Sequence, residues 1–365
     1  MRTLECVTIT GFKSIRELRD FEIRRLNVLV GANGAGKTNF ISVFKLLNHL
    51  IDRRLQIFVA QSGRANSFLH FGRKTTNEIE IELEFGEGNI GNGYEIKLAP
   101  STGGNLFFTR ETWWFHNRAF LRPFTYPILH GHEEARLPEM ANSDKAARYV
   151  LNELSKWRVY HFHDTSESAR VKQTGDLGDN AMLRPDAANL AAFLYLLRNT
   201  HSSHYKRIIE TIRLVAPFFD DFVLRPTPEN QNKIRLEWHE KQSDDYFDAS
   251  YLSDGTLRFI CLATLLLQPQ LPSLLIIDEP ELGLHPYAIN LLADMLQSAA
   301  TKTQVIVSTQ SVPLVNQFLP EDVIVVDRED NQSVFRRLKS EELEEWLEQY
   351  GLGELWEKNV IGGRP

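Results

Sequence analysis

One segment of the chain combines glycines, a lysine and a threonine in a spacing that suits phosphate binding. It reads Gly31-Ala-Asn-Gly-Ala-Gly-Lys-Thr38 and fits the pattern G-x-x-x-x-G-K-T. Glycines let backbone N–H groups turn toward a phosphate, the Lys37 ammonium reaches the β- and γ-oxygens, and the Thr38 hydroxyl is a ligand for Mg²⁺. The segment therefore predicts a site for a nucleotide and magnesium. The residues expected to bind the nucleotide are Asn33, Gly34, Ala35, Gly36, Lys37, Thr38 and Asn39.

Two acidic residues follow an apolar run in Leu274-Leu-Ile-Ile-Asp-Glu-Pro280. In open α/β sheets, ligands sit at the carboxyl ends of the strands, so such a run is the natural partner of a phosphate loop. We expect Asp278 to hold Mg²⁺ through water and Glu279 to polarise the attacking water. The alternative is an ordinary strand that ends in a solvated acidic turn. Because 241 residues separate Lys37 from Asp278, a large segment is inserted between the two halves of the site.

A third segment, Tyr251-Leu-Ser-Asp-Gly-Thr-Leu-Arg258, resembles the LSGGQ-type signature of ABC-class ATPases. Ser253 and Gly255 match its serine and second glycine, whereas Asp254 and Thr256 depart from the commonest form. Residues 278–286, Asp-Glu-Pro-Glu-Leu-Gly-Leu-His-Pro, look like the Walker B motif and D-loop of that class. The chain is most similar to the branch that contains RecF, SMC-type ATPases and the ATPase halves of OLD-family nucleases. Three further stretches carry this likeness: 9–15, 157–166 and 359–365. Of these, 157–166 and 359–365 look like a stand-alone group of bacterial predicted ATPases.

The resemblance implies that two heads pair head to tail, with each ATP held between the phosphate loop of one and the signature segment of the other. Ser253 would then meet the γ-phosphate in trans, although Ser253 is also a good plain helix cap. Gln310 stands where many relatives carry a histidine. Its amide can donate a hydrogen bond to the γ-phosphate but cannot become cationic, which predicts slow hydrolysis; the alternative is a polar strand end. For the glutamine that reaches the metal we choose Gln61, with Gln56 as its rival.

Hydrophobic periodicity predicts strands alternating with helices around a parallel sheet, to which an antiparallel meander is added. We expect a P-loop NTPase of the α/β class, built as an ABC-type ATPase head with an antiparallel β-subdomain and an inserted helical region. The expected strands are 26–30, 78–85, 94–98, 106–115, 234–238, 274–277, 304–308 and 322–327. The expected helices are 37–51, 143–156 capped by Ser143, 186–198, 204–216, and others that start after Ser253, near His285 and near Ser340.

Motif spacing divides the 365 residues into one composite head and an insertion. Residues 1–115 and 216–365 are expected to form the head, and residues 116–215 a mainly helical insert. The net charge of −7 excludes a wholly basic nucleic-acid coat but not a local basic patch. Two cysteines, Cys6 and Cys261, and the lack of a signal peptide or membrane-spanning run favour a cytoplasmic protein with no membrane partner.

Other residues carry weaker signals. His161, His163 and Asp164 have a spacing that can bind a metal, with His130 and His132 as conceivable additions, although a structural histidine pair is favoured. A strip made by Arg53, Arg54, Arg64, Arg73, Lys74, Arg118 and Arg122 is either a solvated face, which is favoured, or a DNA-contacting surface. Trp113-Trp114-Phe115 is more typical of a core than of a base-stacking platform.

Together the motifs predict an ATPase that converts ATP and water to ADP and phosphate at composite sites of a homodimer or a higher homo-oligomer. Lys37, Glu279 and Gln310 would act on the phosphates, and Thr38, Asp278 and Gln61 would lie at Mg²⁺. Because relatives in the resembling branch commonly work on DNA or beside a nuclease, the resemblance implies a role in DNA maintenance or anti-phage defence, with DNA or an effector nuclease or toxin as partner. The alternative is a weakly hydrolysing, nucleotide-gated scaffold that holds an effector. A transporter subunit is disfavoured because 216 residues separate Lys37 from Ser253.

Overall fold

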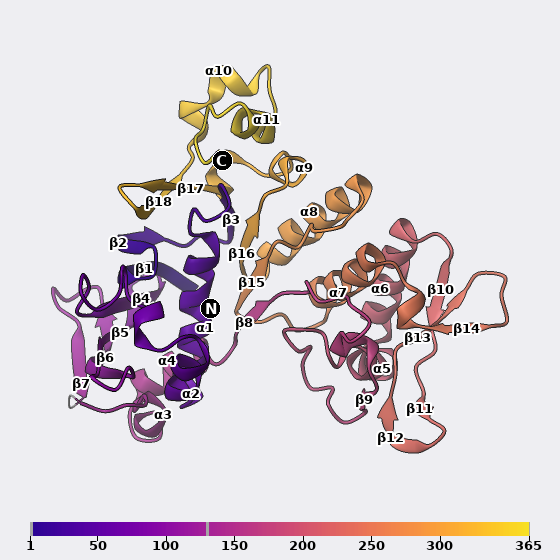
Figure 1. The fold of residues 1–365 in the computed structure, drawn as a ribbon, viewed down its shortest axis with the longest axis horizontal. Coiled ribbons are helices and arrows are strands. Elements are labelled where there is room, and N and C mark those ends of the chain that lie inside the picture. Colours follow the sequence, from indigo (N-terminus) through magenta and orange to yellow (C-terminus); the bar gives the residue numbers. More distant parts are fainter. Residues whose placement is uncertain (1–2, 129–130, 365) are drawn as a thin grey trace. The chain divides into compact units, whose positions relative to one another are not determined.

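The fold, taken from a computed structural model, is of the α/β class and is described for residues 3–128 and 131–364. The chain divides into two compact units, which Figure 1 shows as ribbons. The first comprises Met1–Trp157, Leu319–Tyr350 and Glu354–Pro365. The second comprises Arg158–Phe318 and Gly351–Gly353. The phosphate loop belongs to the first unit, whereas the signature and the carboxylate strand belong to the second.

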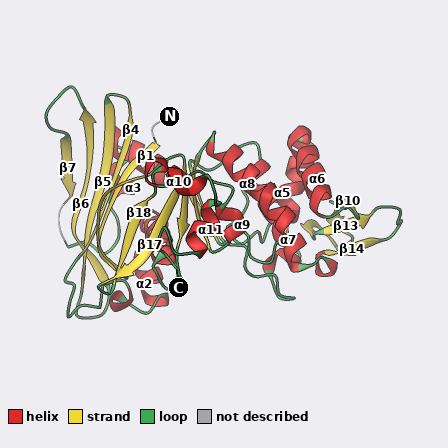
Figure 2. Cartoon of the chain, turned by 90° about the horizontal axis from the view of Figure 1, so that it is seen from above, coloured by secondary structure: helices red, strands yellow, loops and turns green. Residues whose placement is uncertain are grey.

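An antiparallel sheet dominates the first unit, and Figure 2 shows its long strands side by side. Its order is β2-β1-β4-β5-β6-β7. The strands are β1 (Thr3–Phe12), β2 (Ile15–Glu22), β4 (Ile79–Glu87), β5 (Ile90–Pro100), β6 (Leu106–Asn117) and β7 (Phe124–Ile128). The predicted meander is confirmed as β4, β5 and β6, each longer than expected. Burial alternates along β4, which places one side of the sheet against the core.

Next to this sheet, the first unit holds the strand and helix that position the phosphate loop. The loop joins β3 (Leu26–Val30) to α1 (Lys37–Ile51), with the bounds that the sequence predicts. Every residue of β3 is buried, and β3 pairs in parallel with β17 (Val323–Glu329). β18 (Gln332–Arg337) pairs antiparallel with β17. The helices of this unit also include α2 (Leu55–Gln61), α3 (Leu137–Met140), α4 (Lys145–Leu154) and α10 (Glu344–Leu347).

In the second unit, two parallel strands carry the predicted acidic edge. β15 (Leu274–Asp278) pairs with β16 (Gln304–Thr309) so that Asp278 lies opposite Ser308. β8 (Trp157–Tyr160) follows β15 in the sheet order. The helices are α5 (Leu190–Thr200), α6 (Ser202–Val215), α7 (Asp254–Leu267), α8 (Pro286–Ala300) and α9 (Val312–Val315). Short antiparallel pairs complete the unit: β10 (Phe219–Phe222), β13 (Glu237–Glu240) and β14 (Tyr246–Asp248), and β9 (Gly175–Asp176), β12 (Asn230–Ile234) and β11 (Pro226–Thr227).

Several other predicted elements also differ from the structure in their bounds or caps. Asp144, not Ser143, caps α4, because its Oδ1 accepts the N–H of Ala147 at 2.7 Å. α5 begins at Leu190 rather than 186, because the Asn189 side chain receives the N–H of Arg184 and donates to two carbonyls, which fixes a turn there. The strand predicted at 234–238 is split between β12 and β13. The acidic helix expected from Ser340 is broken into short helical pieces at Ser340–Glu342, Glu344–Leu347 and Leu352–Glu357, since like charges a turn apart on a helix repel one another.

The segment expected as a helical insert, 116–215, contains α3, α4, α5 and α6 together with β7 and β8. It runs across the boundary between the two compact units, which falls after Trp157. The chain ends with α11 (Leu352–Glu357). The division of the chain into a composite head with an insert at 116–215 stays a prediction.

Candidate functional site

The phosphate loop is shaped around its lysine. The Lys37 side chain is only 5% exposed, and its Nζ donates to the carbonyls of Gly31 at 2.5 Å and Ala32 at 3.0 Å. Gly36 has φ +124°, and a Cβ there would collide with the hydroxyl oxygens of Ser333 and Ser14. Only glycine fits such a position. The loop is therefore a narrow backbone cradle at the start of α1, with the Thr38 side chain exposed beside it.

A cavity of about 390 Å³ lies within the first unit and adjoins this loop. Asn39, which the sequence predicts as a ligand, donates from Nδ2 to Ser14 Oγ at 2.7 Å. Arg328 approaches the loop from the other side, with its guanidinium 3.5 Å from the Gly34 carbonyl. The lining residues are Lys13, Ser14, Asn39, Ser67, His70, Phe71, Arg328 and Asn331.

Sequence reasoning missed most of these lining residues. Lys13 and Ser14 lie in the stretch 9–15, which carried only a family likeness, and Arg328 belongs to β17. Burial and the nearby Lys45 lower the pKa of Lys13. In the sequence, the signal for Lys13 and Arg328 was their positive charge. In the structure, the parallel pairing of β17 with β3 brings Arg328 near the end of the strand that enters the loop.

The acidic end of β15 is held by hydrogen bonds from the end of β16. Ser308 Oγ donates to Asp278 Oδ1, and the backbone N–H of Glu279 donates to the Ser308 carbonyl at 3.0 Å. Glu279 has φ +44°, a left-handed conformation that is strained for a residue with a Cβ. Gln310 Nε2 donates to Glu279 Oε1. The structure thus brings together Asp278, Glu279 and Gln310, three residues that the sequence singled out.

A fourth residue of this cluster, Glu281, was missed from the sequence. Its side chain is 9% exposed, and its Oε1 accepts the Thr309 hydroxyl at 2.5 Å and the Gln310 N–H at 3.0 Å. Burial, reinforced by the charge of Glu279, raises the pKa of Glu281. The sequence did contain a signal for Glu281. An acid that follows Asp278-Glu-Pro, after a strand beside one that ends in Ser-Thr-Gln, has hydroxyl and amide hydrogen-bond donors within reach.

The signature segment caps its helix and packs on the D-loop. Ser253 is the N-cap of α7, and its Oγ accepts the N–H of Thr256 at 3.2 Å, so it fulfils the plain capping role at least. A Cβ at Gly255 would collide with the Gly283 carbonyl, which explains why glycine stands there. One turn later, Arg258 is 5% exposed and donates to the carbonyls of Phe162, Leu282 and His163. Burial lowers the pKa of Arg258.

One residue of the histidine pair, His163, contacts the carboxylate strand. A ring nitrogen of His163 lies 2.9 Å from the Asp278 carbonyl oxygen. Asp164 accepts two hydrogen bonds from Ser166, and these lower the pKa of its carboxyl. His132 instead pairs with Glu111 at 2.6 Å, and His130 lies outside the described residues. Among the residues that the structure describes, no group of three or more His, Cys, Asp or Glu side chains is placed to hold a metal ion.

The two candidate metal-reaching glutamines differ in their surroundings. Gln56 Nε2 donates to the carbonyls of Leu106 at 2.8 Å and Glu133 at 2.6 Å, so its amide is engaged in holding β6. Gln61 is exposed at the end of α2 and is not among the residues that line the cavity beside the loop. Its place at Mg²⁺ therefore stays a prediction.

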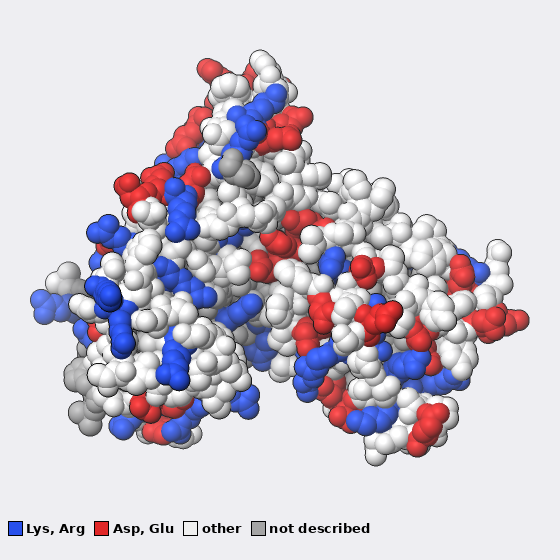
Figure 3. Space-filling model, viewed as in Figure 1, with Lys and Arg blue, Asp and Glu red and all other residues white. Residues whose placement is uncertain are grey.

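The basic strip and the tryptophans have identifiable partners. Arg53 pairs with Glu139 at 2.8 Å and Arg118 pairs with Glu5, so part of the strip is neutralised. Figure 3 shows Lys and Arg side chains spaced over the first unit, separated by uncharged surface. Trp113 and Trp114 are buried, as predicted, and Trp113 Nε1 donates to Asp144 Oδ1 at 2.8 Å.

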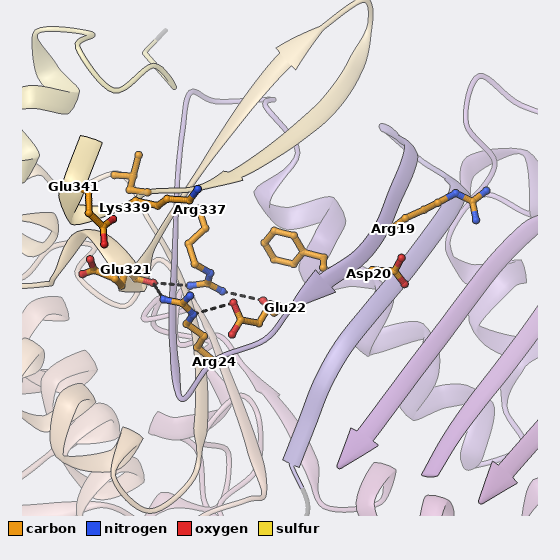
Figure 4. A pocket seen from close by; sticks show the side chains of 10 residues that line it. Arg19, Asp20, Glu22, Arg24, Glu321, Arg337, Lys339 and Glu341 are labelled. Carbon is orange, nitrogen blue, oxygen red and sulfur yellow. Dashed lines mark hydrogen bonds and ion pairs between the residues drawn. The ribbon is translucent and has the colours of Figure 1, made fainter. Parts of the chain in front are cut away.

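A second cavity in the first unit, of about 420 Å³, is rich in charge but internally paired (Figure 4). Arg337 donates to the carbonyls of Glu321 and Glu22, each at 2.9 Å, and Arg24 Nε pairs with Glu22 at 3.0 Å. Burial and the nearby Arg24 lower the pKa of Arg337 to about 10. These contacts link β2 to β18, so we interpret the cluster as structural.

Comparison with known proteins finds a curated relative and solved structures that are similar to this chain. A stretch of 150 residues is 30% identical to the Old nuclease of Escherichia phage P2 and covers 36% of this chain but only 26% of that nuclease, about a quarter of its length. The Smc head bound to the C-terminal winged-helix domain of ScpA is similar with a TM-score of 0.61 at 16% identity, over 94% of this chain and 99% of that one. The Smc head with an extended coiled coil, bound to the C-terminal domain of ScpA from Pyrococcus furiosus, gives 0.60 at 14% identity, over 96% and 99%.

These structural likenesses show the fold, which is the P-loop fold of ABC-type ATPase heads. None of the described helices is long and apolar enough to cross a membrane. Residues 26–316, most of the chain, match the family described as "AAA domain, putative AbiEii toxin, Type IV TA system". The chain therefore belongs to this family and is an ABC/AAA-type ATPase of the RecF, SMC and OLD kind.

Proposed function

We propose that the protein binds MgATP and hydrolyses it to ADP and phosphate at composite sites of a homodimer or higher homo-oligomer. The observation that carries the proposal is that one chain contains both a glycine cradle around Lys37 in its first unit and an acidic strand end, on which Gln310 meets Glu279, in its second unit. Both features fit the group that they would hold. The cradle has no room for a Cβ at Gly36, and Thr38 and Asp278 offer the oxygen atoms that Mg²⁺ prefers.

Each proposed role follows from the chemistry of the side chain. Lys37 adds positive charge at the β- and γ-phosphates, where charge develops during phosphoryl transfer. Asp278 would hold the metal, and Glu279 would accept a hydrogen bond from the attacking water and orient it. Ser253 and Gly255 at the start of α7 would bind the γ-phosphate of the partner copy, because the N–H groups at a helix N-terminus attract anions.

The cavity beside the loop suits the nucleoside half of ATP. It adjoins the loop through Ser14, Asn39 and Arg328, and its volume is about 390 Å³. Ligand pockets for small molecules begin at about 300 Å³. We assign the adenosine to this cavity, with Arg328 as a cation near the phosphates.

The test is steady-state ATP turnover of the purified chain with two variants. Glu279→Gln should lower kcat by about 10²- to 10⁴-fold, the usual contribution of a general base, and leave ATP binding intact. Lys37→Ala should lose tight ATP binding, measured by equilibrium titration. Glu210→Gln, an exposed acid on α6, is the matched control. Equal turnover of Glu279→Gln and wild type would contradict the assigned base, and retained tight binding by Lys37→Ala would contradict the loop.

For the biological role we propose DNA maintenance or defence against phage, with DNA or an effector nuclease or toxin as partner. The family description, which names a toxin, and the likeness to a phage nuclease support this setting. Turnover that rises with added DNA would favour it. Mass measurement with and without ATP would test the ATP-linked dimer.

The second candidate is a nucleotide-gated scaffold that hydrolyses ATP slowly. One observation favours it: the amide of Gln310 is bonded to Glu279, so that hydrogen bond must yield before the amide can donate to a γ-phosphate. A partner protein that co-purifies in fixed ratio, together with slow and DNA-insensitive turnover, would support this alternative.

A further inference from the structure

Side-chain hydrogen bonds link the residues at the end of β16 to the acidic residues at and after the end of β15. Ser308 donates to Asp278, Gln310 donates to Glu279, and Thr309 donates to Glu281. Each residue at the end of β16 therefore has one acidic partner in the segment 278–281. The first two acids have roles in the function proposed above, whereas the third, Glu281, has none.

We propose that Glu281 is a positioning residue that fixes Gln310, and through it Glu279, in the geometry for hydrolysis. This inference deepens the proposed ATPase function and rests on it. Glu281 touches Gln310 at its backbone, where Oε1 accepts the N–H at 3.0 Å. The Gln310 side chain then reaches Glu279 Oε1. Glu281 thus acts on the candidate base through one intermediate residue.

The surroundings of Glu281 show that a polar group is held there at a cost. Its carboxyl is nine-tenths buried, and Oε2 has no hydrogen-bond partner among residues 3–128 and 131–364. Burying a polar atom without a partner costs free energy that an apolar side chain of similar size would avoid. Burial also raises the pKa of Glu281. A glutamine amide is close to the carboxyl group in shape and keeps an accepting oxygen.

The strain at Glu279 explains why such an anchor is needed. Its backbone has φ +44°, so the carboxylate leaves the strand in a direction that an extended residue would not give. A strained conformation persists only where its neighbours fix it. The turn that follows is closed by the N–H of Leu284, which donates to the Glu281 carbonyl at 3.0 Å. Glu281 therefore holds the strained turn by its backbone carbonyl and the Gln310 backbone by its side chain.

A loss of this anchor should affect the chemical step rather than ATP binding. Without the Glu281 carboxyl, the Gln310 backbone is free to move and its amide no longer holds the Glu279 carboxylate in one orientation. A hydrogen bond to a charged group contributes about 1.5–3 kcal/mol. If that contribution is lost at the chemical step, kcat falls by about 10- to 150-fold.

The experiment is a double-mutant cycle on the full chain, read as kcat and KM for ATP. Glu281→Leu should lower kcat at least about tenfold with KM within twofold, and Glu281→Gln should stay within about threefold of wild type. Gln310→Ala should lower kcat too, and adding Glu281→Leu to it should cause little further loss, because both changes break one chain of contacts. Full turnover of Glu281→Leu, or losses that multiply in the double variant, would overturn the proposal.

A second readout does not depend on turnover. The side-chain amide resonance of Gln310, identified by its absence in Gln310→Ala, should be shifted and protected in wild type and in Glu281→Gln, but free in Glu281→Leu. An unchanged amide in Glu281→Leu would refute the positioning role even if the leucine variant were inactive. If wild type and Lys37→Ala had the same turnover, the ATPase function would fail, and the amide resonance would still decide the role of Glu281.

Discussion

Arg258 offers a quantitative test of how the signature helix is joined to the D-loop. Its guanidinium donates to the Phe162 carbonyl at 2.9 Å and to the carbonyls of Leu282 and His163, while the side chain is 5% exposed. Arg258→Met would leave these acceptors without their charged donor. Each unsatisfied buried group costs about 1–3 kcal/mol, but the variant also removes the cost of burying a cation.

We therefore expect a net destabilisation of about 2 kcal/mol in the local structure that Arg258 joins. This corresponds to about a 30-fold rise in the opening equilibrium, since 1.4 kcal/mol is a factor of ten. Arg258→Lys should lose about half as much, because an ammonium is a single point donor and cannot span two segments as a planar guanidinium does. Methionine keeps the length and the apolar stem of the arginine side chain, so comparing Arg258→Met with wild type isolates the contribution of the charged guanidinium.

Native-state hydrogen exchange is the suitable assay because it reports each amide separately in a chain of two units. The N–H groups of Leu282 and Leu284 donate to carbonyls within the D-loop turn and serve as probes. Their protection should fall about 30-fold in Arg258→Met and remain unchanged in Arg207→Met, an exposed arginine on α6. Equal protection in Arg258→Met and wild type would refute the reasoning.

Two further predictions concern stability of the first unit. Burial and the nearby Glu95 and Glu84 raise the pKa of Glu82 from 4.5 to about 7, so the folded state binds this proton more tightly and loses stability as pH rises from 4.5 to 7. Glu82→Gln should add about 1 kcal/mol at pH 8, after allowance for solvent screening of a half-exposed group, and almost nothing below pH 4.5; a pH-independent difference in unfolding free energy would contradict this. Glu111, fully buried, accepts from Tyr94, His132 and the N–H groups of Arg136 and Leu137, so Glu111→Ala should cost about 3–5 kcal/mol in urea unfolding, and a loss below about 1 kcal/mol would contradict it.

Sequence patterns predicted elements well where local chemistry determines them. The segment 26–51 has an apolar strand, a loop that needs glycine and an amphipathic helix, and the bounds of β3 and α1 are as predicted. The helix after Ser253 was predicted from its cap, which the structure shows. In these places, propensity, capping and burial all favour the same structure, so no distant partner is needed to decide it.

Elements were mispredicted where a side chain competes with the backbone for hydrogen bonds. The Asn189 side chain bonds to Asp179, Met182 and Arg184, all earlier in the chain, and delays α5, although the apolar periodicity from 186 onward favours a helix. The strand at 234–238 is interrupted because the Leu236 carbonyl accepts the N–H of Ala249, and Arg235 pairs with Asp248. These partners lie outside the predicted elements themselves, so the periodicity within each element carries no information on them.

The candidate site shows the same division. The cradle around Lys37 and the acids Asp278 and Glu279 could be found because a phosphate and a metal each require particular residue types in fixed order. Glu281 and Arg258 were missed because their partners are backbone groups and short polar side chains, which any sequence offers in quantity. Only the parallel register that places Asp278 opposite Ser308 brings Thr309 and Gln310 to the segment 279–281.

That register also decides what a glutamine in the position of the usual histidine can do. Gln310 is held at both ends, by Glu281 at its backbone N–H and by Glu279 at its amide, so its side chain has one orientation without needing a charge. A histidine there would change its hydrogen bonding with protonation, whereas the amide does not titrate. The orientation of residue 310 would then depend on the position of β16 rather than on pH. The turnover of Gln310→His should acquire a pH dependence near the pKa of histidine that the wild type lacks. A pH profile of Gln310→His identical to that of the wild type would show that the orientation of residue 310 does not govern the reaction.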